Sequence, residues 1–288
     1  MKKFITALLL LLCLTPVVMA QDEAENSEPI TVPELFYGTR TINFQTVRQI
    51  GKKVLAYRIS HRFGSFTDDA LYNWVGLDGP ASISFMFDYG ITDKLMIGLA
   101  RDQFQKTYNG FVKYNLMDQQ SGGGSPVSVS LYGKANIISL RPPVGGFNRY
   151  ESFSNRMAYT AQILVARRFG DRFALQVAPT FIHLNLVDLA GDKNDILAIT
   201  ASAQVMLTKR LGISGEFSYT LNEYSPVPER FFPSAGVGLD IVTGGHVFQI
   251  TFTNSRIINE TFLIPYSRAD WFKGDFRIGF NISRNFWL

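Results

Sequence analysis

Apolar side chains alternate with small or polar ones over most of the chain. The clearest example is SISFMFDYGITDKLMIGLARD, residues 82–102, in which Ile83, Phe85 and Phe87 recur at every second position. Because successive side chains of a β-strand point to opposite faces, this alternation predicts two strands, each with one apolar face and one small or polar face. The residues at 92–94 form a short turn between them.

The same alternation recurs about twelve times from residue 54 to the end of the chain. Each segment is close to the length of about 9–11 residues that a tilted strand needs to cross a bilayer. Residues 39–53 fit a short helix or a strand equally well and stay outside this count. The predicted strands are 54–63, 82–91, 95–102, 109–117, 126–137, 156–169, 172–186, 195–208, 211–221, 234–242, 246–254 and 274–286.

The lengths of the connections separate into two classes. Short turns follow the even-numbered strands, whereas most connections after odd-numbered strands are long, notably 64–79, 138–154, 222–233 and 255–273. Short turns on one rim, long loops on the other and an even strand count are typical of outer-membrane barrels. We therefore predict an all-β fold, a transmembrane antiparallel up-and-down β-barrel of about twelve strands whose apolar face meets lipid.

Aromatic residues support the lipid-facing assignment, because two aromatic girdles are typical of a barrel in a bilayer. One predicted girdle lies at the short-turn rim and the other at the long-loop rim. Their members are Tyr89, Tyr114, Phe169, Phe173 and Phe286 at the first rim, and Phe63, Phe104, Tyr108, Tyr159, Tyr219 and Phe276 at the second.

The first residues predict export. MKKFITALLLLLCLTPVVMA has two lysines, an apolar run too short to span a bilayer and small residues placed for cleavage after Ala20, as in a secretory signal peptide. Cleavage would also remove Cys13, the only cysteine. The predicted organisation is a signal peptide at 1–20, an N-terminal leader and periplasmic segment at 21–52, and an outer-membrane β-barrel at 53–288.

The charge balance bears on partners. Without Lys2 and Lys3 the 28 basic residues fall to 26, against 24 acidic residues, which gives no reason to expect nucleic acid as a partner. The expected partners are outer-membrane lipid and small solutes.

Five stretches together resemble a known family. They are TRTINFQT (39–46), YRISHRFG (57–64), FDYGITDKLMIGLAR (87–101), KTYNGFVKY (106–114) and SVSLYGKANI (128–137). The family consists of exported proteins of Gram-negative bacteria and is described only as a membrane-bound β-barrel domain of unknown function. The resemblance covers essentially the whole mature chain. It implies an outer-membrane barrel and supplies no catalytic or binding residues.

The three histidines do not form a recognisable metal-binding motif. His61, His183 and His246 lie on different predicted strands, and none has a second ligand at metal spacing nearby, so we predict no metal, cofactor or catalytic residue. Two different functions stay open. The first is that of an outer-membrane lipid hydrolase using His61 or His183, although the chain contains no G-x-S-x-G motif. The second is that of a soluble periplasmic lipid-binding barrel.

Charged residues on the small-and-polar face are the candidates for function. Such charges inside a membrane protein mark either a water path or a paired network. The sequence therefore predicts a narrow pore for small solutes with a mild preference for anions, or a structural component of the outer membrane whose charges interlock and fill the barrel. The lumen-facing candidates are Arg58, Arg62, Asp88, Lys113, Lys134, Arg168, Glu216, Asp240 and Arg277.

Overall fold

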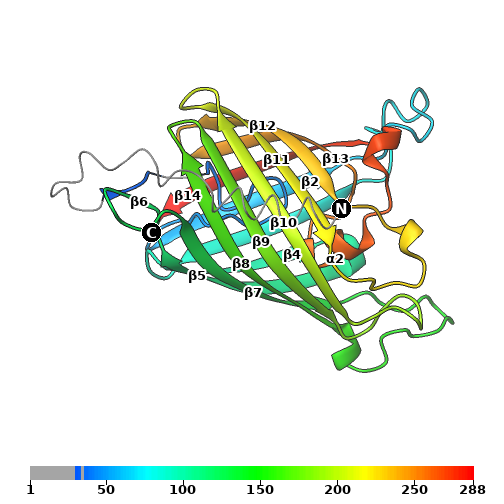
Figure 1. The fold of residues 1–288 in the computed structure, drawn as a ribbon. Coiled ribbons are helices and arrows are strands. Elements are labelled where there is room, and N and C mark those ends of the chain that lie inside the picture. The colour runs from blue at the N-terminus through cyan, green and yellow to red at the C-terminus, as the bar shows by residue number, and fades with distance from the viewer. Residues whose placement is uncertain (1–29, 34–35) are drawn as a thin grey trace.

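A computed structural model describes residues 30–33 and 36–288 of the chain. Twelve of its strands close into one barrel (Figure 1). The predicted signal peptide lies outside the described residues. The wall strands are β2 (Val54–Arg62), β3 (Ser82–Gly90), β4 (Leu95–Asp102), β5 (Thr107–Met117), β7 (Ser128–Ile138), β8 (Met157–Phe169), β9 (Phe173–Leu184), β10 (Asp195–Met206), β11 (Leu211–Thr220), β12 (Ala235–Thr243), β13 (His246–Thr253) and β14 (Arg277–Trp287).

The remaining elements are short. Strand β1 (Ile30–Thr31) pairs with β6 (Gln120–Ser121) outside the wall. Helix α2 (Glu260–Tyr266) lies in the connection between β13 and β14, and Asn259 caps it by accepting a hydrogen bond from the Thr261 amide. No helix within the described residues is long and apolar enough to cross a membrane. Single 3₁₀ turns occupy Phe104–Lys106, Ser154–Arg156, Pro228–Arg230 and Trp271–Lys273.

Every wall strand pairs antiparallel with its neighbours in chain order, and the last strand pairs with the first. At this seam between β14 and β2, Asn281 lies opposite Ser60, and Gly279 lies opposite Arg62. The predicted fold class, an antiparallel up-and-down barrel of twelve strands, is confirmed. The observed strand ends differ from the predicted ones by only a few residues.

The two faces of the wall follow the alternation of the sequence. On β3 the side chains of Ser84 and Asp88 are buried inside the barrel, whereas Phe85 and Phe87 are 37% and 48% exposed on its outer surface. Outward-facing apolar side chains are the arrangement that lipid requires of a barrel. The apolar face of each strand therefore meets the surroundings of the barrel, and the small or polar face lines its interior.

The connections segregate to the two ends as predicted. We call one end the short-turn end, where β3 joins β4, β8 joins β9 and β12 joins β13 (Figure 1). The other is the long-loop end, which holds the connection that carries α2. One rim aromatic departs from the prediction: Phe104 turns inward and packs against Phe262 of α2, with ring centroids 5.6 Å apart.

Candidate functional site

The interior of the barrel holds a segment that is not part of its wall. Residues 36–50, here called the plug hairpin, enter from the short-turn end, reverse direction at Ile42 and Asn43, and return to begin β2. The turn is closed by hydrogen bonds from the Thr41 amide to the Phe44 carbonyl, 3.0 Å, and from the Thr46 amide to the Thr39 carbonyl, 2.8 Å. Residues 40–47 of this hairpin are almost fully buried, and apolar and polar residues alternate from 41 to 45.

Glu216 of β11 holds the tip of the plug hairpin. One carboxylate oxygen accepts the backbone N–H groups of Ile42, Asn43 and Phe44, at 3.2, 2.7 and 3.1 Å. The other oxygen accepts the side-chain amide of Asn43 at 2.6 Å. Consecutive N–H groups converging on one carboxylate form an anion-binding concavity, so this buried charge is compensated.

The seam strands hold the same tip from the other side. Arg58 of β2 donates to the Ile42 carbonyl at 2.8 Å, and Arg62 donates to the Asn43 side-chain oxygen at 2.9 Å. Asn281 of β14 donates to the Ile42 carbonyl at 3.3 Å and accepts from Arg62 at 3.0 Å. Both strands of the seam are therefore tied to one turn of the plug hairpin.

Further charges fix the arms of the plug hairpin. Arg40 forms a salt bridge with Asp88 of β3 at 3.1 Å, and both side chains are almost completely buried. Lys113 of β5 donates to the carbonyl oxygens of Thr46 and Arg48, at 2.9 and 2.6 Å. Each of these buried wall charges has a partner on the hairpin, as burial of a charge requires.

A second segment enters from the long-loop end. Residues 255–269, here called the plug loop, carry α2 into the barrel. Glu260 forms a salt bridge with Lys134 of β7 at 2.9 Å and accepts the Tyr132 hydroxyl at 2.7 Å. Burial opposes the charged form of Glu260, but Lys134 and Arg40 outweigh that effect and lower the pKa of the Glu260 carboxyl.

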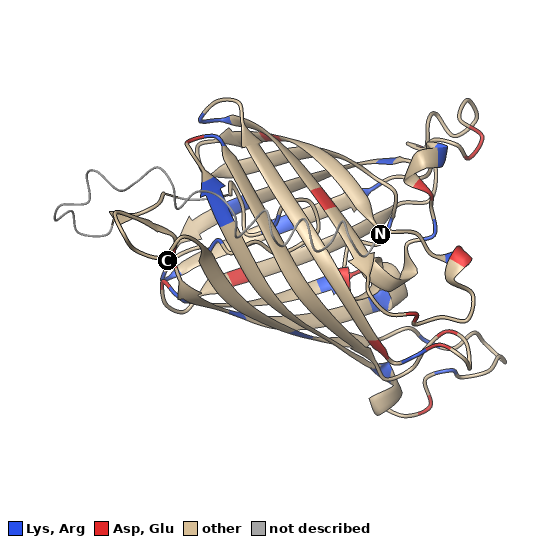
Figure 2. Cartoon of the chain, in the orientation of Figure 1, with Lys and Arg blue, Asp and Glu red and all other residues tan. Residues whose placement is uncertain are grey.

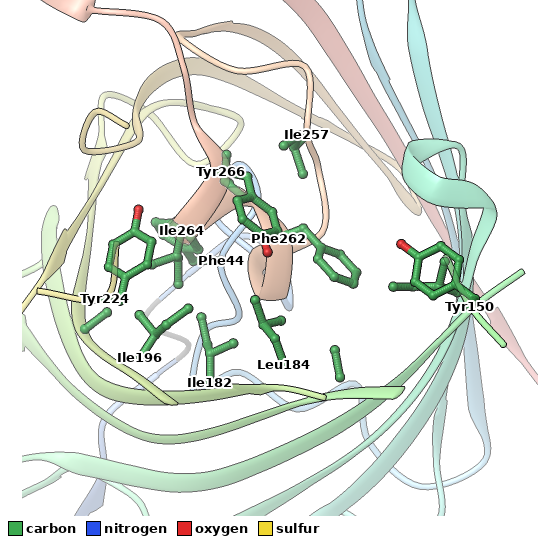
Figure 3. Close-up of a cluster of buried hydrophobic side chains, with 14 residues drawn as sticks. Phe44, Tyr150, Ile182, Leu184, Ile196, Tyr224, Ile257, Phe262, Ile264 and Tyr266 are labelled. Atoms are coloured by element: carbon green, nitrogen blue, oxygen red, sulfur yellow. The ribbon is translucent and has the colours of Figure 1, made fainter. Parts of the chain in front are cut away.

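The two segments meet inside the barrel. Phe44 of the plug hairpin and Phe262 of the plug loop belong to one buried apolar cluster (Figure 3). Wall residues of β9 and β10 also belong to it, among them Ile182, Leu184 and Ile196. Together, the plug hairpin and the plug loop place side chains across the interior of the barrel.

Seven of the nine predicted lumen candidates are buried, and Figure 2 shows charged positions on the wall strands as well as in the loops. Two candidates lie at opposite ends of the barrel. Arg168 donates to the carbonyl oxygens of Gly170 and Asp171 beside a short turn, and Arg277 donates to the Asn254 carbonyl at the long-loop end. The buried seven are Arg58, Arg62, Asp88, Lys113, Lys134, Glu216 and Asp240.

The candidate set omitted one wall carboxylate. Asp102, at the end of β4, is 3% exposed and accepts hydrogen bonds from Ser84, Asn109 and Asn259, at 2.5, 2.6 and 2.9 Å. The alternation of β4 places Asp102 on the inner face with Met96, so the signal was in the sequence. With Asp102 included, four cations and four carboxylates of the described wall strands are buried in the lumen, which removes the charge excess behind the expected anion preference.

The barrel matches a known protein family over most of the chain. The family described as "Membrane bound beta barrel domain" (DUF5777) matches residues 36–286, which include the plug hairpin, the plug loop and all of the wall except the last residue of β14. The chain belongs to this family. The resemblance noted in the sequence is confirmed, and the protein is a membrane-bound β-barrel.

Several solved structures resemble this DUF5777 barrel at low sequence identity. No curated protein matches the chain. A KdgM porin is 10% identical with a TM-score of 0.47, over 81% of this chain and 99% of the porin. An outer membrane channel from Pseudomonas putida F1 is 10% identical with a TM-score of 0.48, over 83% of this chain and 98% of the channel. Outer membrane phospholipase A from Escherichia coli is 10% identical with a TM-score of 0.44, over 81% and 93% of the two chains.

The histidines of the DUF5777 barrel lie on its outer surface or at its rims. His183 binds Asp195 through Nδ1 at 2.6 Å, and His61 stacks on Phe280 with centroids 5.2 Å apart. A hydrolase of the serine type also needs a hydroxyl hydrogen-bonded to the histidine. Within residues 30–33 and 36–288, no serine or threonine hydroxyl bonds to His61 or His183, and no cluster of three metal-ligating residues occurs.

Sequence reasoning missed both plugs of this DUF5777 barrel, although a signal existed. The inner face of a membrane barrel is usually polar. Here the inner register includes large apolar residues that are fully buried, which requires apolar partners inside the barrel. Those wall residues are Met96, Leu164, Ile182 and Ile196.

Proposed function

We propose that the protein is an outer-membrane channel for small polar solutes, closed at rest by the plug hairpin and the plug loop. The short-turn end faces the periplasm, and the long-loop end faces the outside. The apolar outer surface and the exported N-terminus expected from the sequence support this location. This proposal requires that the plug hairpin and the plug loop can leave the lumen. If they cannot, the barrel is permanently filled.

The observation that carries the proposal is how the plug hairpin is attached. Each of its hydrogen bonds with the wall involves a side chain. Glu216 holds the tip, Lys113 and Gln176 hold the returning arm, and the Tyr37 hydroxyl donates to the Leu211 carbonyl of β11. No backbone ladder of the described wall ends on the hairpin, because each wall strand already pairs with two wall neighbours. Withdrawal of the hairpin would therefore leave the wall closed and expose a lumen lined by charged and polar groups.

Buried charges also favour a lumen that can take up water. A barrel that only needed filling would be served by apolar side chains, since replacing a buried ion pair by apolar residues is often neutral or stabilising. When the plugs leave, water can solvate groups such as Lys113 and Asp88 at little cost. Because buried wall cations and carboxylates are equal in number, we expect weak charge selectivity and discrimination by size.

A structural role in the membrane is the second candidate. It is favoured by the interlocked contacts of Glu216 and of the Lys134–Glu260 pair, which would keep the barrel closed if neither segment ever left. The hydrolase and the lipid carrier have less support. The hydrolase lacks a nucleophile at His61 and His183, and a carrier of lipid would need an apolar interior instead of the charged one observed.

Planar-bilayer recordings test the channel. We expect rare openings in the unmodified protein and frequent openings when both anchors are weakened in a Glu216→Gln, Glu260→Gln double variant. Glu223→Gln, which changes an exposed loop carboxylate, serves as the matched control and should behave like the unmodified protein. If Ser202→Cys is added to the double variant and this lumen thiol becomes accessible to a reagent while no current passes, the channel is refuted and the structural role is favoured.

A further inference from the structure

A pocket of about 550 Å³ lies at the long-loop end of the barrel. Its walls come from the start of β3, the 3₁₀ turn at Phe104–Lys106, both ends of the plug loop and the start of β14. This volume is within the range of about 300–1,000 Å³ that is usual for small-molecule sites. The lining residues of the pocket make none of the hydrogen bonds that hold the plug hairpin.

The pocket is rich in guanidinium groups. Arg256 and Arg268 come from the plug loop, and Arg277 comes from β14. The one carboxylate in the lining is Asp188, which binds Arg149 at 3.1 Å and Arg268 at 3.6 Å. Asp188 is therefore shared between two arginines, and Arg277 pairs with Asp275, which lies outside the lining, at 3.5 Å. With three arginines and one carboxylate, the lining itself still carries an excess of positive charge.

Two buried polar atoms in the lining have no hydrogen-bond partner among the described residues. They are the Nε donor of Arg277 and the Oε1 acceptor of Gln105. Gln105 also has a left-handed backbone with φ of 49°, a conformation that costs energy for a residue with a side chain. Unsatisfied buried groups and local strain commonly occur together at binding sites.

We propose that this pocket binds a small organic anion that carries a carboxylate or a phosphate group. Guanidinium groups recognise both groups through paired, charge-assisted hydrogen bonds. The Nε atom of Arg277 supplies a donor for the anion, and the Oε1 atom of Gln105 supplies an acceptor for a hydroxyl group of the same molecule. Tyr266 and Phe104 add apolar surface beside these polar groups.

Binding is linked to the position of the plug loop. Arg256, Ile257, Tyr266 and Arg268 all belong to that loop, so the pocket is complete only while α2 is docked inside the barrel. A ligand that binds only one of two states stabilises that state. An anion in the pocket therefore holds the plug loop in place, and this consequence can be measured whether or not the barrel conducts.

Isothermal titration of the purified full-length protein in detergent at low salt tests the site. Citrate supplies the carboxylate, inorganic phosphate supplies the phosphate, and glucose is the uncharged control. The test variant is Arg256→Gln with Arg268→Gln, since both side chains are exposed and their loss should leave the barrel intact. The matched control is Arg284→Gln, which removes an exposed arginine from the opposite end of the same strand as Arg277.

We expect saturable binding of citrate, of phosphate or of both, with affinity at least tenfold weaker in the double variant and unchanged in Arg284→Gln. Binding should also weaken with added salt, because the two plug-loop arginines are exposed. Comparison of the two anions identifies the recognised group. The proposal fails if neither anion binds, if glucose binds as well as they do, or if Arg284→Gln weakens binding as much as the double variant.

Discussion

Replacing Glu216 by Gln should release the plug hairpin without unfolding the barrel. The carboxylate accepts three backbone N–H groups and one side-chain amide, and it is 7% exposed. Glutamine has nearly the same shape, but it has no charge, and an NH₂ group, which donates hydrogen bonds, replaces one acceptor oxygen. If its oxygen stays on the three backbone amides, each charge-assisted hydrogen bond becomes a neutral one.

The magnitude follows from that exchange. Hydrogen bonds to a charged group contribute about 1.5–3 kcal/mol each, against about 0.5–1.5 kcal/mol for neutral ones. A loss of about 1 kcal/mol at each of three amides lowers the docking free energy of the hairpin by about 3 kcal/mol. Since 1.36 kcal/mol corresponds to a factor of ten, the undocked population should rise on the order of 100-fold.

Thiol labelling measures this population. Cys13 is the only cysteine in the sequence, so in a chain cleaved after Ala20, as the sequence predicts, Ser202→Cys introduces a unique thiol. Ser202 is 2% exposed, and its hydroxyl lies 3.0 Å from that of Thr41, so a reagent reaches this position only when the hairpin has moved. When opening and closing are fast, the labelling rate is proportional to the open population.

We expect labelling on the order of 100-fold faster in Glu216→Gln than in the Ser202→Cys parent, with unchanged strand content by circular dichroism. The control Glu223→Gln should label at the parental rate. Equal rates in all three proteins would show that Glu216 does not hold the hairpin, and a loss of strand content in Glu216→Gln would show that the hairpin cannot leave the wall intact.

Three further predictions concern the wall, the plug loop and the histidines. Phe85→Arg should destabilise the folded barrel in bilayers by about 2–4 kcal/mol if the site lies near the bilayer midplane, whereas Arg in place of Leu71, 96% exposed in a loop, should have no measurable effect on the free energy of unfolding. Because the pKa of Glu260 is lowered, its ion pair stabilises the docked plug loop above the ordinary carboxyl pKa of about 4.3, and this stabilisation is lost as the pH falls through the lowered value. Thiol access to the lumen should therefore rise on acidification, and Glu260→Gln should show the raised access at neutral pH. His61→Ala and His183→Ala should leave any ester hydrolysis by purified protein unchanged, and loss of a genuine activity in either variant would revive the hydrolase.

The wall could be predicted from the sequence because its signals are local. Alternation in a segment such as 82–102 sets which side chains share a face, and the short turn at 92–94 makes its two strands neighbours. Antiparallel pairing in chain order then needs no long-range information. The same register is sufficient to place Arg58, Lys113 and Glu216 on the inner face.

The contents of the barrel could not be predicted in the same way. Register assigns Glu216 to the inner face but does not say that its partners are backbone amides more than 170 positions earlier in the chain. Likewise, the alternation does not show that Arg40, which precedes the first wall strand, lies inside the barrel and pairs with Asp88 of β3. Register also places Arg168 on the inner face, but it does not show that this side chain binds carbonyl oxygens at the rim.

The tip of the plug hairpin also bears on how the barrel is assembled. The hairpin directly precedes β2, and β2 pairs with β14, so this seam joins the first and last wall strands of the chain. Arg62 and Asn281 reach the turn at Asn43 only if the two strands pair in the observed alignment. A shift by one residue would turn one of these polar side chains toward lipid and leave the turn without its partners. The contacts of the hairpin therefore favour the observed alignment of the first and last wall strands over a shifted one.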